Sequence, residues 1–402
     1  MLELEEAQCR ILAALKILPR ETVPLHAANG RFLADRIISE IDLPPFDNSA
    51  MDGYALGAND LQNATRDEPT LLQEIGKIPA GEFFRGVILP GHCARIFTGS
   101  PLPAGADAVA MQEDAAANPR NPLEIQFFDS VKPWENVRFL GEDVKKGAVL
   151  MEAGMRLNAA NLSLLAAVGI EKVLVGRQPL TAILATGSEL REAGMRLQAG
   201  QIFESNRIGI AALASQMGAI PRVFPIVADS LLQTKEAMAR AFSECDVVIT
   251  TGGVSVGELD FVKTAFGELG GRLDFWKISL KPGKPFVFGQ LGEKFLFGLP
   301  GNPVSAFVTF ILLVAPALAK LQGATHFQWP AQSGILIESL ENLGDRRHFV
   351  RVCVDEKGSV RSAGSQASHI VSALAKSNGL VEIPARTVFA ENTVVKVLRW
   401  EL

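Results

Sequence analysis

Three glycine-rich turns lie close together in the second half of the chain, and their residue types suit the binding of an anion. The turns cover residues 250–257, 281–285 and 299–305, and each follows an apolar run typical of a β-strand. Between them they supply backbone N–H groups, hydroxyls, lysines and a carboxylate. Such groups hold phosphates and other oxyanions when strand ends and helix starts present them. The pattern predicts a site for a phosphorylated or oxyanionic small molecule, together with a divalent metal.

The first turn matches neither of two common nucleotide-binding patterns. Its sequence, TTGGVSVG, lacks the G-x-x-x-x-G-K-[ST] spacing of a P-loop and the G-x-G-x-x-G spacing of a Rossmann fold. Gly252 and Gly253 would let backbone approach a ligand closely, and Ser255 adds a hydroxyl. A tight turn in which Asp260 only caps the next helix explains the same residues. Both interpretations stay open at this point.

The second turn carries two lysines, and a third lies nearby. Lys281 and Lys284 flank Pro282 and Gly283, so a stiff bend can direct both ammonium groups to one place. Lys277 adds a third cation in a chain of net charge −5. A lysine ammonium group is a compact charge suited to oxyanion binding. A solvated basic turn is the alternative.

The third turn precedes a long apolar stretch. Pro303 suits the first position of a helix, and the free N–H groups of such a helix start attract anions, so Pro300 and Ser305 can contribute to a binding turn. Simple helix initiation is the alternative. Residues 303–319 carry no charge, but Pro316 interrupts them and a membrane span needs about 20 apolar residues. We expect a helix buried in a protein core or in a subunit interface.

Three acidic residues that follow predicted strands are candidate metal ligands: Glu189, Asp229 and Asp260. Mg²⁺ usually takes one or two carboxylates, and ligand phosphates and waters complete its coordination. Taken singly, each acid is equally compatible with a solvated surface position. The five histidines show no zinc-binding spacing.

Further polar segments occur in the first half of the chain. Residues 47–55, with the sequence DNSAMDGYA, place two carboxylates, an amide and a hydroxyl beside the only tyrosine. Residues 97–101 and 141–143 combine glycine with hydroxyl or acidic side chains in the same way. Asp-Asn-Ser is common in turns, so each segment alone favours a structural role.

A parallel sheet would position the three glycine-rich turns. From about residue 178 the pattern alternates, with strands expected at residues 181–185, 220–227 and 246–250. Alternation of this kind favours a parallel sheet with right-handed crossovers, and ligands bind at the C-terminal ends of such strands. Thr186 and Thr251 lie at those ends in this interpretation.

Helices are expected between these strands. Ser205 or Asn206 can cap a helix that runs through Met217 and is closed by Gly218, and Asp229 can cap the helix after it.

Smaller structural units are expected in the rest of the chain. A helix that includes Ile11 and Leu18 is expected at the N-terminus, where Pro19 ends it. Short strands separated by Pro and Gly dominate residues 43–150, followed by a helix at 161–168 and a strand at 173–175.

Short strands return near the C-terminus, at residues 334–337, 349–354 and 393–398. The fold class expected is therefore a multidomain α/β plus β protein.

Composition excludes several classes of protein. A chain of 402 residues with 48% hydrophobic and 21% charged residues fits a globular enzyme of about two to four domains. A mildly acidic chain predicts no nucleic-acid binding, because phosphate contacts need a basic face. The four scattered cysteines form no C-x-x-C pair, and acidic residues stand where a secretory signal would be positive. We expect a cytoplasmic protein with no membrane span.

Several motifs, taken in order, closely resemble the molybdopterin molybdenumtransferase family, which includes the gephyrin E domain. They are residues 46–55, 98–101, 141–143, 251–257, 281–285 and 298–305, and the resemblance extends over the whole chain. One departure is Ser188, where many members of the family have Asp before the Glu.

The resemblance implies four domains. Domain I comprises residues 1–43 and 145–177 and takes part in dimerisation, and an inserted β-rich domain II comprises residues 44–144. Domain III, residues 178–325, is a three-layer α/β domain with a mostly parallel sheet that binds molybdopterin. Domain IV, residues 326–402, is a small β-barrel-like domain. The family forms homodimers whose active cleft is shared between the subunits.

The implied reaction inserts molybdenum from molybdate into adenylated molybdopterin, releases AMP and requires Mg²⁺. A molybdopterin adenylyltransferase would be the upstream partner. The resemblance implies catalytic roles for Asp52, Asp143, Glu189, Asp260, Lys277 and Lys281. It implies ligand binding by Thr98, Thr251, Gly252, Gly253, Ser255, Lys284, Pro300, Ser305, Arg351 and Ser368, and Mg²⁺ binding by Glu189, Asp229 and Asp260. Asp52, Thr98 and Asp143 would come from the partner subunit.

Two other functions stay open. An enzyme similar to molybdopterin adenylyltransferases would consume ATP with free molybdopterin. A non-enzymatic pterin-binding scaffold would need neither the acids nor the lysines. Both are less consistent with this chain, which has the segment at residues 47–55 that the adenylyltransferases lack, and which keeps the acids and lysines.

Overall fold

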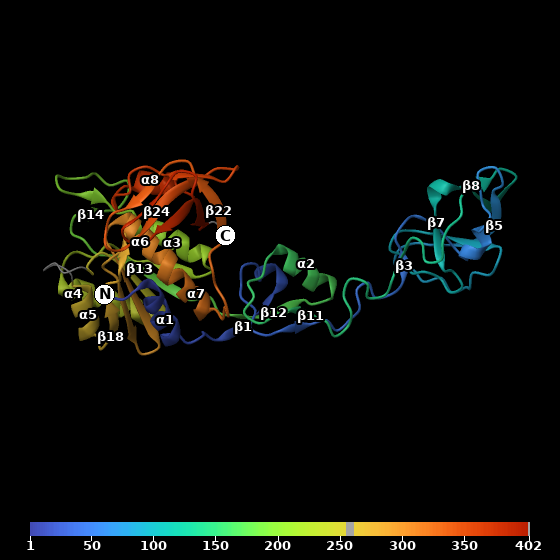
Figure 1. The fold of residues 1–402 in the computed structure, drawn as a ribbon. Helices are drawn as coiled ribbons and strands as arrows, with labels where there is room; N and C mark the ends of the chain where they lie inside the picture. The colour runs from blue at the N-terminus through green and yellow to red at the C-terminus, as the bar shows by residue number, and fades with distance from the viewer. Residues whose placement is uncertain (255–260, 401–402) are drawn as a thin grey trace. The chain divides into compact units, whose positions relative to one another are not determined.

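The computed structural model describes residues 1–254 and 261–400, which form two compact units. The larger unit comprises Met1–Asp35, Ala153–Ala159 and Lys172–Leu402, and the smaller unit comprises Arg36–Glu152 and Ala160–Glu171 (Figure 1). This division is coarser than the four predicted domains, whose boundaries stay a prediction.

The centre of the larger unit is a six-stranded sheet in the order β16-β13-β17-β21-β20-β18. Its strands are β13 (Leu180–Ala185), β16 (Ile220–Val223), β17 (Val247–Thr251), β18 (Arg272–Trp276), β20 (Val287–Leu291) and β21 (Lys294–Leu299). Strand β13 pairs in parallel with β16 and β17, and β17 pairs in parallel with β21. Only β20 runs against its neighbours, so the mostly parallel sheet is confirmed.

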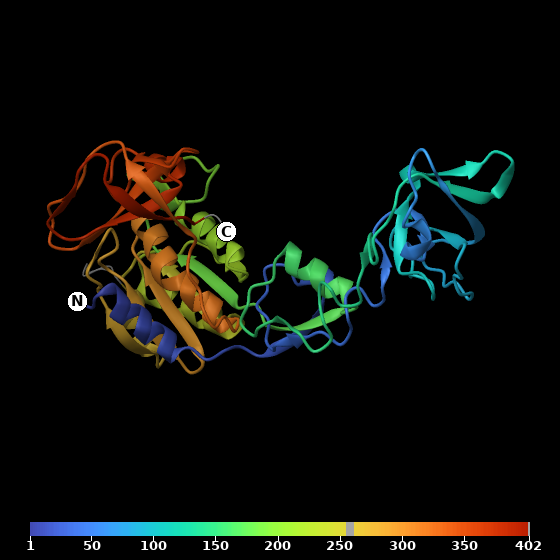
Figure 2. The same cartoon turned by 45° about the vertical axis from the view of Figure 1, so that its right-hand side comes forward.

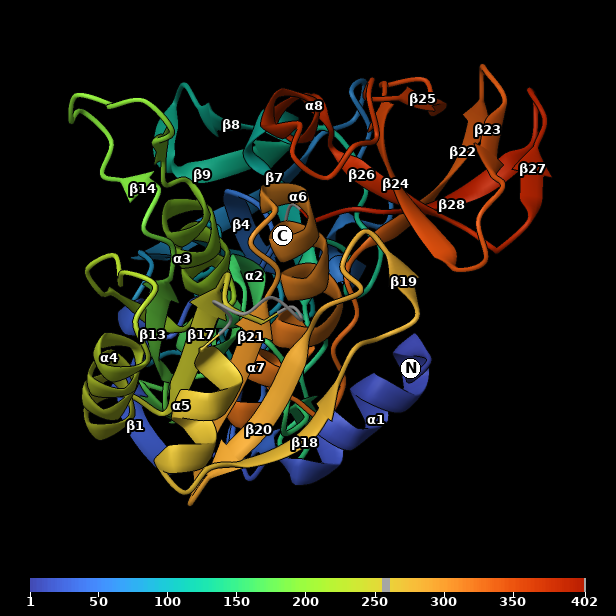
Figure 3. The same cartoon turned by 90° about the vertical axis from the view of Figure 1, so that its left-hand side faces the viewer.

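Helices cover both faces of this sheet because its strands are apolar on both sides. In β17, Val247 and Ile249 belong to one buried cluster and Val248 to another. The first cluster includes residues of α1 (Leu4–Ala14), α3 (Asn206–Gln216), α6 (Pro303–Thr309) and α7 (Ala315–Leu321). The second includes residues of α4 (Leu231–Glu244) and α5 (Val262–Glu268). The result is the expected three-layer arrangement, with α4 and α5 on one side and α1 and α7 on the other (Figure 3).

The long apolar helix is a core element. A continuous helical stretch from Pro303 to Leu321 has the length and composition of a membrane span, but 83% of its apolar window is buried inside the protein. A π-helical segment, η4 (Phe310–Val314), separates α6 from α7 just before Pro316. Proline lacks the N–H that would bond to the carbonyl of Leu312, and the amide of Gln8 donates to that carbonyl at 2.8 Å. The predicted burial of this helix is confirmed.

The C-terminal part of the larger unit is a closed five-stranded barrel. Its order is β24-β25-β22-β28-β26, and a β24–β26 pairing closes the ring. The strands are β22 (Ala331–Leu336), β24 (Arg347–Val354), β25 (Ser359–Ser362), β26 (Gly379–Ile383) and β28 (Val394–Leu398). Alternate residues such as Val395 and Val397 fill its interior. Figure 2 shows this barrel, in red, against the α/β layers.

Shorter elements complete the larger unit. They are β1 (Arg20–Pro24), η1 (Leu25–Ala27), β12 (Lys172–Gly176), β14 (Leu190–Arg191), β15 (Ile202–Phe203), β19 (Leu280–Lys281), β23 (Leu340–Asn342), β27 (Thr387–Phe389) and α8 (Val371–Lys376). Strand β19 pairs with β24 and so joins the second turn to the barrel. Strands β14 and β15 form a small parallel pair.

The smaller unit is β-rich, as predicted. Its main sheet has the order β7-β4-β6-β5-β9-β8. The strands are β4 (Gly53–Leu56), β5 (Thr70–Ile78), β6 (His92–Ile96), β7 (Ala108–Met111), β8 (Ala115–Asn118) and β9 (Asn121–Phe127). The remaining elements are β2 (Ile37–Ile38), β3 (Asn48–Ser49), η2 (Ala58–Leu61), η3 (Gln112–Asp114), β10 (Val137–Arg138), β11 (Val149–Met151) and α2 (Ala159–Ala167).

Three expectations about element ends are wrong. Helix α1 ends at Ala14, so Leu18 and Pro19 lie beyond it. Strand β16 ends at Val223, after four residues. Asp229 does not cap α4, because the hydroxyl of Ser230 accepts the bond from the N–H of Gln233. The Asp229 carboxylate instead accepts a bond from the N–H of Ser188, in the loop after β13.

Candidate functional site

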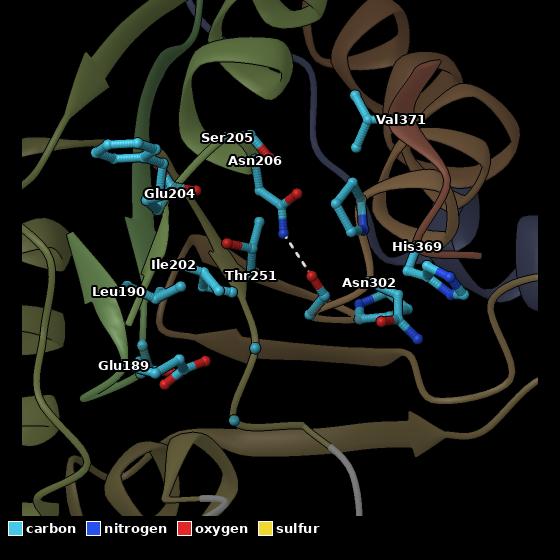
Figure 4. Close-up of a pocket in the computed structure, with 18 of the residues that line it drawn as sticks. Glu189, Leu190, Ile202, Glu204, Ser205, Asn206, Thr251, Asn302, His369 and Val371 are labelled. Atoms are coloured by element: carbon cyan, nitrogen blue, oxygen red, sulfur yellow. Dashed lines mark hydrogen bonds between the residues drawn. The ribbon is translucent and has the colours of Figure 1, made fainter. Parts of the chain in front are cut away.

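A cavity of about 660 Å³ lies in the larger unit where the C-terminal ends of β13 and β17 meet the start of α6 (Figure 4). Its lining comprises Thr186, Gly187, Glu189, Leu190, Ile202, Phe203, Glu204, Ser205, Asn206, Asp229, Thr251, Gly252, Gly253, Pro285, Pro300, Gly301, Asn302, Pro303, His369 and Val371. We call it the main cavity. Its position at the ends of parallel strands is the one that the sequence pattern predicts.

Glycine at the end of β17 allows two backbone segments to approach closely. Gly252 and Gly253 have φ angles of +83° and +65°, which side-chain-bearing residues rarely adopt. A methyl group on Gly252 would lie 2.8 Å from the carbonyl oxygen of Thr186, and one on Gly253 would lie 2.8 Å from the Thr186 hydroxyl. That hydroxyl is buried, and among the described residues it has no hydrogen-bond partner. The first turn thus packs its backbone closely against Thr186, which also lines the cavity.

Polar side chains hold the third turn in place at the start of α6. The amide of Asn206 donates to the carbonyl of Gly301 at 2.7 Å, a bond drawn in Figure 4. The amide of Asn302 donates to the hydroxyl of Ser368 at 3.0 Å, and the N–H of Val304 donates to the carbonyl of Ser368 at 3.1 Å. Ser368 therefore lies beside the helix start without lining the cavity, and it anchors the barrel to this turn.

Two of the predicted metal ligands lie in the cavity wall. The carboxylate of Asp229 accepts a bond of 2.9 Å from the N–H of Ser188, while the Ser188 hydroxyl accepts one of 3.0 Å from the N–H of Asp229. Glu189 follows directly and also lines the cavity. Asp260 and Ser255 lie outside the described residues. In the part of the chain that is described, no group of three acidic, His or Cys residues is placed to hold a metal.

The charges in the wall explain why a cation would be needed for an anionic ligand. Of the three carboxylates that line the cavity, Glu204 is buried and paired with Arg207 at 2.8 Å. Glu189 and Asp229 have no such partner among the described residues, and the lining contains no Lys or Arg. A phosphate placed beside two carboxylates would be repelled. This donor set therefore fits Mg²⁺, which binds through one or two carboxylates and the phosphates of a ligand.

The lysines of the second turn lie near the cavity but outside its lining. Lys281 and Lys284 are exposed, while Pro285 between the turn and β20 lines the cavity. The ammonium group of Lys277 lies 3.8 Å from the ring centre of Trp276, a cation–π contact. None of the three lysines has a carboxylate partner among the described residues.

Two predicted ligand-binding residues are buried away from the cavity. Ser305 is 5% exposed inside α6. Arg351 is 1% exposed, and its guanidinium group donates to the carbonyls of Ser365, Ala367 and Ile370. Burial lowers the pKa of Arg351. These bonds hold the loop that carries Ser368, so Arg351 positions this loop without lining the cavity itself.

The smaller unit brings two other predicted residues together. Asp52 precedes β4 and Thr98 follows β6, and Gly53 pairs with Ile96 across these antiparallel strands. The Asp52 carboxylate accepts bonds of 2.8 Å from both the N–H and the hydroxyl of Thr98. These bonds lower the pKa of Asp52. Asp143 is exposed, and its N–H donates to the carbonyl of Leu43.

Comparison with known protein families covers nearly the whole chain. Residues 2–169 match the MoeA N-terminal region (domains I and II), residues 182–320 match a probable molybdopterin-binding domain, and residues 334–400 match the MoeA C-terminal region (domain IV). A molybdopterin molybdenumtransferase of Haemophilus influenzae is 42% identical over 385 residues, which are 94% of this chain and 93% of the relative. The chain belongs to the molybdopterin molybdenumtransferase family.

Other relatives agree with this membership. Molybdopterin molybdenumtransferase 2 of Mycobacterium tuberculosis is 35% identical over the full length of both chains. The crystal structure of a molybdopterin biosynthesis protein MoeA from Pyrococcus horikoshii is 33% identical, covers 99% of this chain and 100% of its own, and has a TM-score of 0.84. The predicted fold class is therefore confirmed for this molybdopterin molybdenumtransferase family member.

Sequence reasoning missed part of the cavity wall. Asn302, His369 and Val371 line the cavity, and Asn206, expected only as a possible helix cap, contributes its side chain. The loop from β14 to α3 is held by Arg207, which binds Glu204 and Glu192. Glu204 precedes α3, and its carboxylate accepts bonds from both the N–H and the guanidinium group of Arg207, so an acidic residue just before a helix with a basic residue in its first turn was a usable signal. The approach of His369 to α6 depends on tertiary contacts and had no local signal.

Proposed function

We propose that this family member is a molybdenum insertase, a transferase that moves molybdenum from molybdate into adenylated molybdopterin and releases AMP in a Mg²⁺-dependent reaction. The observation that carries the proposal is the near full-length similarity to relatives named molybdopterin molybdenumtransferase. The main cavity supports it, because glycine backbone, a helix start and two carboxylates without a cationic partner among the described residues suit a phosphorylated ligand with a cation.

Each part of the cavity has a role in this proposal. Backbone N–H groups near Gly252 and Gly253 bind the phosphates, and Pro300 shapes the turn before α6. Glu189 and Asp229, together with Asp260, hold Mg²⁺, which neutralises phosphate charge when bound. Thr251 lines the same wall. The exposed lysines at positions 281 and 284 attract the molybdate dianion toward the cavity.

The proposal extends to a homodimer. The paired Asp52 and Thr98, with Asp143, supply acidic and hydroxyl groups to the cavity of the partner subunit. Thr98 and Asp143 are exposed and Asp52 is half-buried, which supports a role in contacts outside their own unit. The scattered free cysteines support a reducing, cytoplasmic location. A molybdopterin adenylyltransferase supplies the adenylated substrate.

The decisive test is release of AMP from adenylated molybdopterin by the purified protein. We expect release only when both molybdate and Mg²⁺ are present, and no requirement for ATP. Tungstate assayed in parallel gives the preference between the two oxyanions. A folded dimer that releases no AMP in response to molybdate would refute the insertase, and ATP consumption with free molybdopterin would favour an adenylyltransferase instead.

A further inference from the structure

Backbone hydrogen bonds close the segment at residues 277–284, which carries the three predicted anion-binding lysines. The N–H of Lys277 donates to the carbonyl of Phe286 at 3.0 Å, and the N–H of Ile278 donates to the carbonyl of Lys284 at 3.1 Å. Lys277 has a φ angle of +73°, and a residue other than glycine keeps such a conformation only where its surroundings hold it. We call this segment the lysine loop, and its shape depends on what packs around it.

The far end of the lysine loop is fixed by α6 and by the barrel. Gly283 lies so close to α6 that a methyl group on it would be 2.5 Å from the Cγ2 atom of Thr309. Strand β19 pairs in parallel with β24, and the guanidinium group of Arg346 donates to the carbonyl of Leu280 at 3.0 Å. These contacts fix the backbone around the two exposed lysines of the loop.

The near end of the lysine loop is held by the first residues of the chain. Leu2 and Ile278 form a parallel bridge. The N–H of Leu2 donates to the carbonyl of Lys277 at 3.4 Å, and the N–H of Ser279 donates to the carbonyl of Leu2 at 2.8 Å. Leu2 also packs against the core cluster that contains Ile278, and Figure 3 shows the start of α1 beside β19. The residue with the positive φ angle is therefore bonded directly to the N-terminal segment.

An ion pair fixes the start of α1 against the strand that pairs with the loop. Arg347 lies in β24 opposite Leu280 of β19, and its guanidinium group donates to both carboxylate oxygens of Glu5, at 2.6 and 2.5 Å. It also donates to Glu382 at 3.0 Å. The bond from Arg347 lowers the pKa of Glu5. A pair with two such bonds is specific in its geometry, so Glu5 sets where α1 begins relative to the loop.

We propose that residues 1–6 act as a brace that positions the lysine loop for the oxyanion of the reaction. This inference rests on the proposed function, in which the loop lysines attract molybdate. A lysine carries its charge on a flexible stem, so several ammonium groups converge on one anion only if the backbone that carries them is fixed. Leu2 and Glu5 are positioning residues, since neither is among the described residues that line the main cavity.

Deleting Leu2 and Glu3 removes the backbone part of the brace. Met1 then directly precedes α1, and its carbonyl can accept the N–H of Ala7 as that of Glu3 does. We expect kcat/KM for molybdate to fall at least about tenfold, mainly through KM, because a displacement of about 1 Å can cost up to about 100-fold. Calorimetry should show weaker binding of tungstate, used as a stable oxyanion probe, and unchanged binding of AMP with Mg²⁺.

A milder variant keeps the chain intact and has a matched control. Glu5→Gln removes the charge that Arg347 holds, and KM for molybdate should rise about two- to fivefold, the range that a partly exposed ion pair supplies. Glu6→Gln breaks an exposed ion pair with Arg10 inside the same helix and should leave KM unchanged. Hydrogen exchange of the Ser279 N–H should be faster in the deletion variant and in Glu5→Gln, but not in Glu6→Gln.

Thermal unfolding checks that each variant is folded. If the deletion variant and Glu5→Gln keep both the KM for molybdate and the exchange rate at Ser279, the N-terminal segment does not position the loop. If the deletion weakens AMP binding as much as tungstate binding, or if Glu6→Gln has the effect of Glu5→Gln, the segment only stabilises the larger unit and the brace is rejected.

The outcome is separable from that of the proposed function. Molybdate-dependent AMP release with the same KM in every variant rejects the brace alone. Absence of that release, with tungstate binding that still weakens in the deletion variant, rejects the insertase and retains a braced oxyanion site. If the unmodified protein neither binds tungstate nor releases AMP, both are rejected.

Discussion

Asp229 and Asp52 are both carboxylates beside strand ends that accept a backbone N–H, yet their surroundings differ. Asp229 lies in the wall of a 660 Å³ cavity beside Glu189 and glycine-rich backbone. Asp52 is half-buried just before the start of β4, where both of its bonds come from Thr98. The region around Asp229 has a cavity, a helix start and two carboxylates. The region around Asp52 has a single carboxylate that two hydrogen bonds hold in position.

This difference indicates that the two regions have different roles in the proposed homodimer: one binds the substrate, and the other adds groups to the site of the partner subunit. In the proposed function, the main cavity binds the phosphates and the cation within one unit. The region around Asp52 offers a carboxylate whose hydrogen bonds lower its pKa, and in the proposed dimer it acts on a ligand bound by the partner subunit. Variants in the two regions should therefore affect different steps.

Neutralising Asp229 should have the largest effect. Asp229→Asn keeps an oxygen to accept the Ser188 N–H but removes the charge. We expect AMP-releasing turnover to fall at least about 100-fold, by comparison with losses at groups around bound metals. AMP binding with Mg²⁺ should weaken as well, because the cation loses a carboxylate. Steady-state assays over a range of Mg²⁺ concentrations measure the first effect, and calorimetry measures the second.

Two further variants complete this test. Glu236→Gln removes an exposed carboxylate from α4 and should change neither quantity. Asp52→Asn should reduce turnover and leave AMP binding unchanged. If Asp52→Asn weakens AMP binding as much as Asp229→Asn does, the division of roles between the regions is wrong.

Much of the larger unit could be predicted because its signals are local. The run at residues 181–185 and the glycines after residue 250 lie where the sequence places a buried strand and its turn. The end of β16 was not predictable, since the chain beyond Val223 bonds to β13 and its extension only at Phe224 and at an isolated bridge of Val227 with Thr186. Cores can bury an apolar run with or without strand pairing, so periodicity does not separate the two cases.

The site was predictable where a residue acts through its own turn and less so where it acts through distant contacts. Glu189, Asp229 and Gly252 line the main cavity as expected. Arg351 was expected at an anion, but its guanidinium group is committed to carbonyls 14 to 19 residues further along the chain. An arginine in a β-strand carries no local signal that distinguishes these uses, because the difference depends on which loop folds over it.

The stability of the larger unit should depend on pH through His348. This residue is 4% exposed, both ring nitrogens lack partners among the described residues, and burial with nearby Lys281 and Arg351 lowers its pKa to about 4. Between about pH 4 and 6.5 the unfolded chain binds a proton that the folded chain does not, so stability rises with pH in this window. Lowering the pH from 7 to 5 should cost about 2 kcal/mol.

Hydrogen exchange at pH 5 and pH 7 can show which of the two units loses stability in acid. We expect amides of β24 to lose protection at pH 5 and those of β5 to keep it, since β5 belongs to the smaller unit. His348→Leu should abolish the difference between pH 5 and 7, and His326→Gln, at an exposed histidine, should preserve it. Equal losses in both units would show that they unfold as one body.

The smallest effect is expected at Thr98, and it should appear only in acid. Hydrogen bonds from Thr98 lower the pKa of Asp52, so the carboxylate stays ionised as the pH falls toward its lowered pKa. Thr98→Ala removes the hydroxyl but keeps the N–H, which is the larger cause of the lowered pKa, so the pKa should rise only part of the way toward its ordinary value.

Turnover of the Thr98→Ala variant at pH 7 should change less than about tenfold, because Asp52 remains ionised there in both proteins. The acid limb of kcat/KM should move to higher pH, and Thr98→Ser should restore it. An acid limb that does not move would mean that ionisation of Asp52 does not control this step, and the exposed region would then contribute shape to the shared site rather than charge.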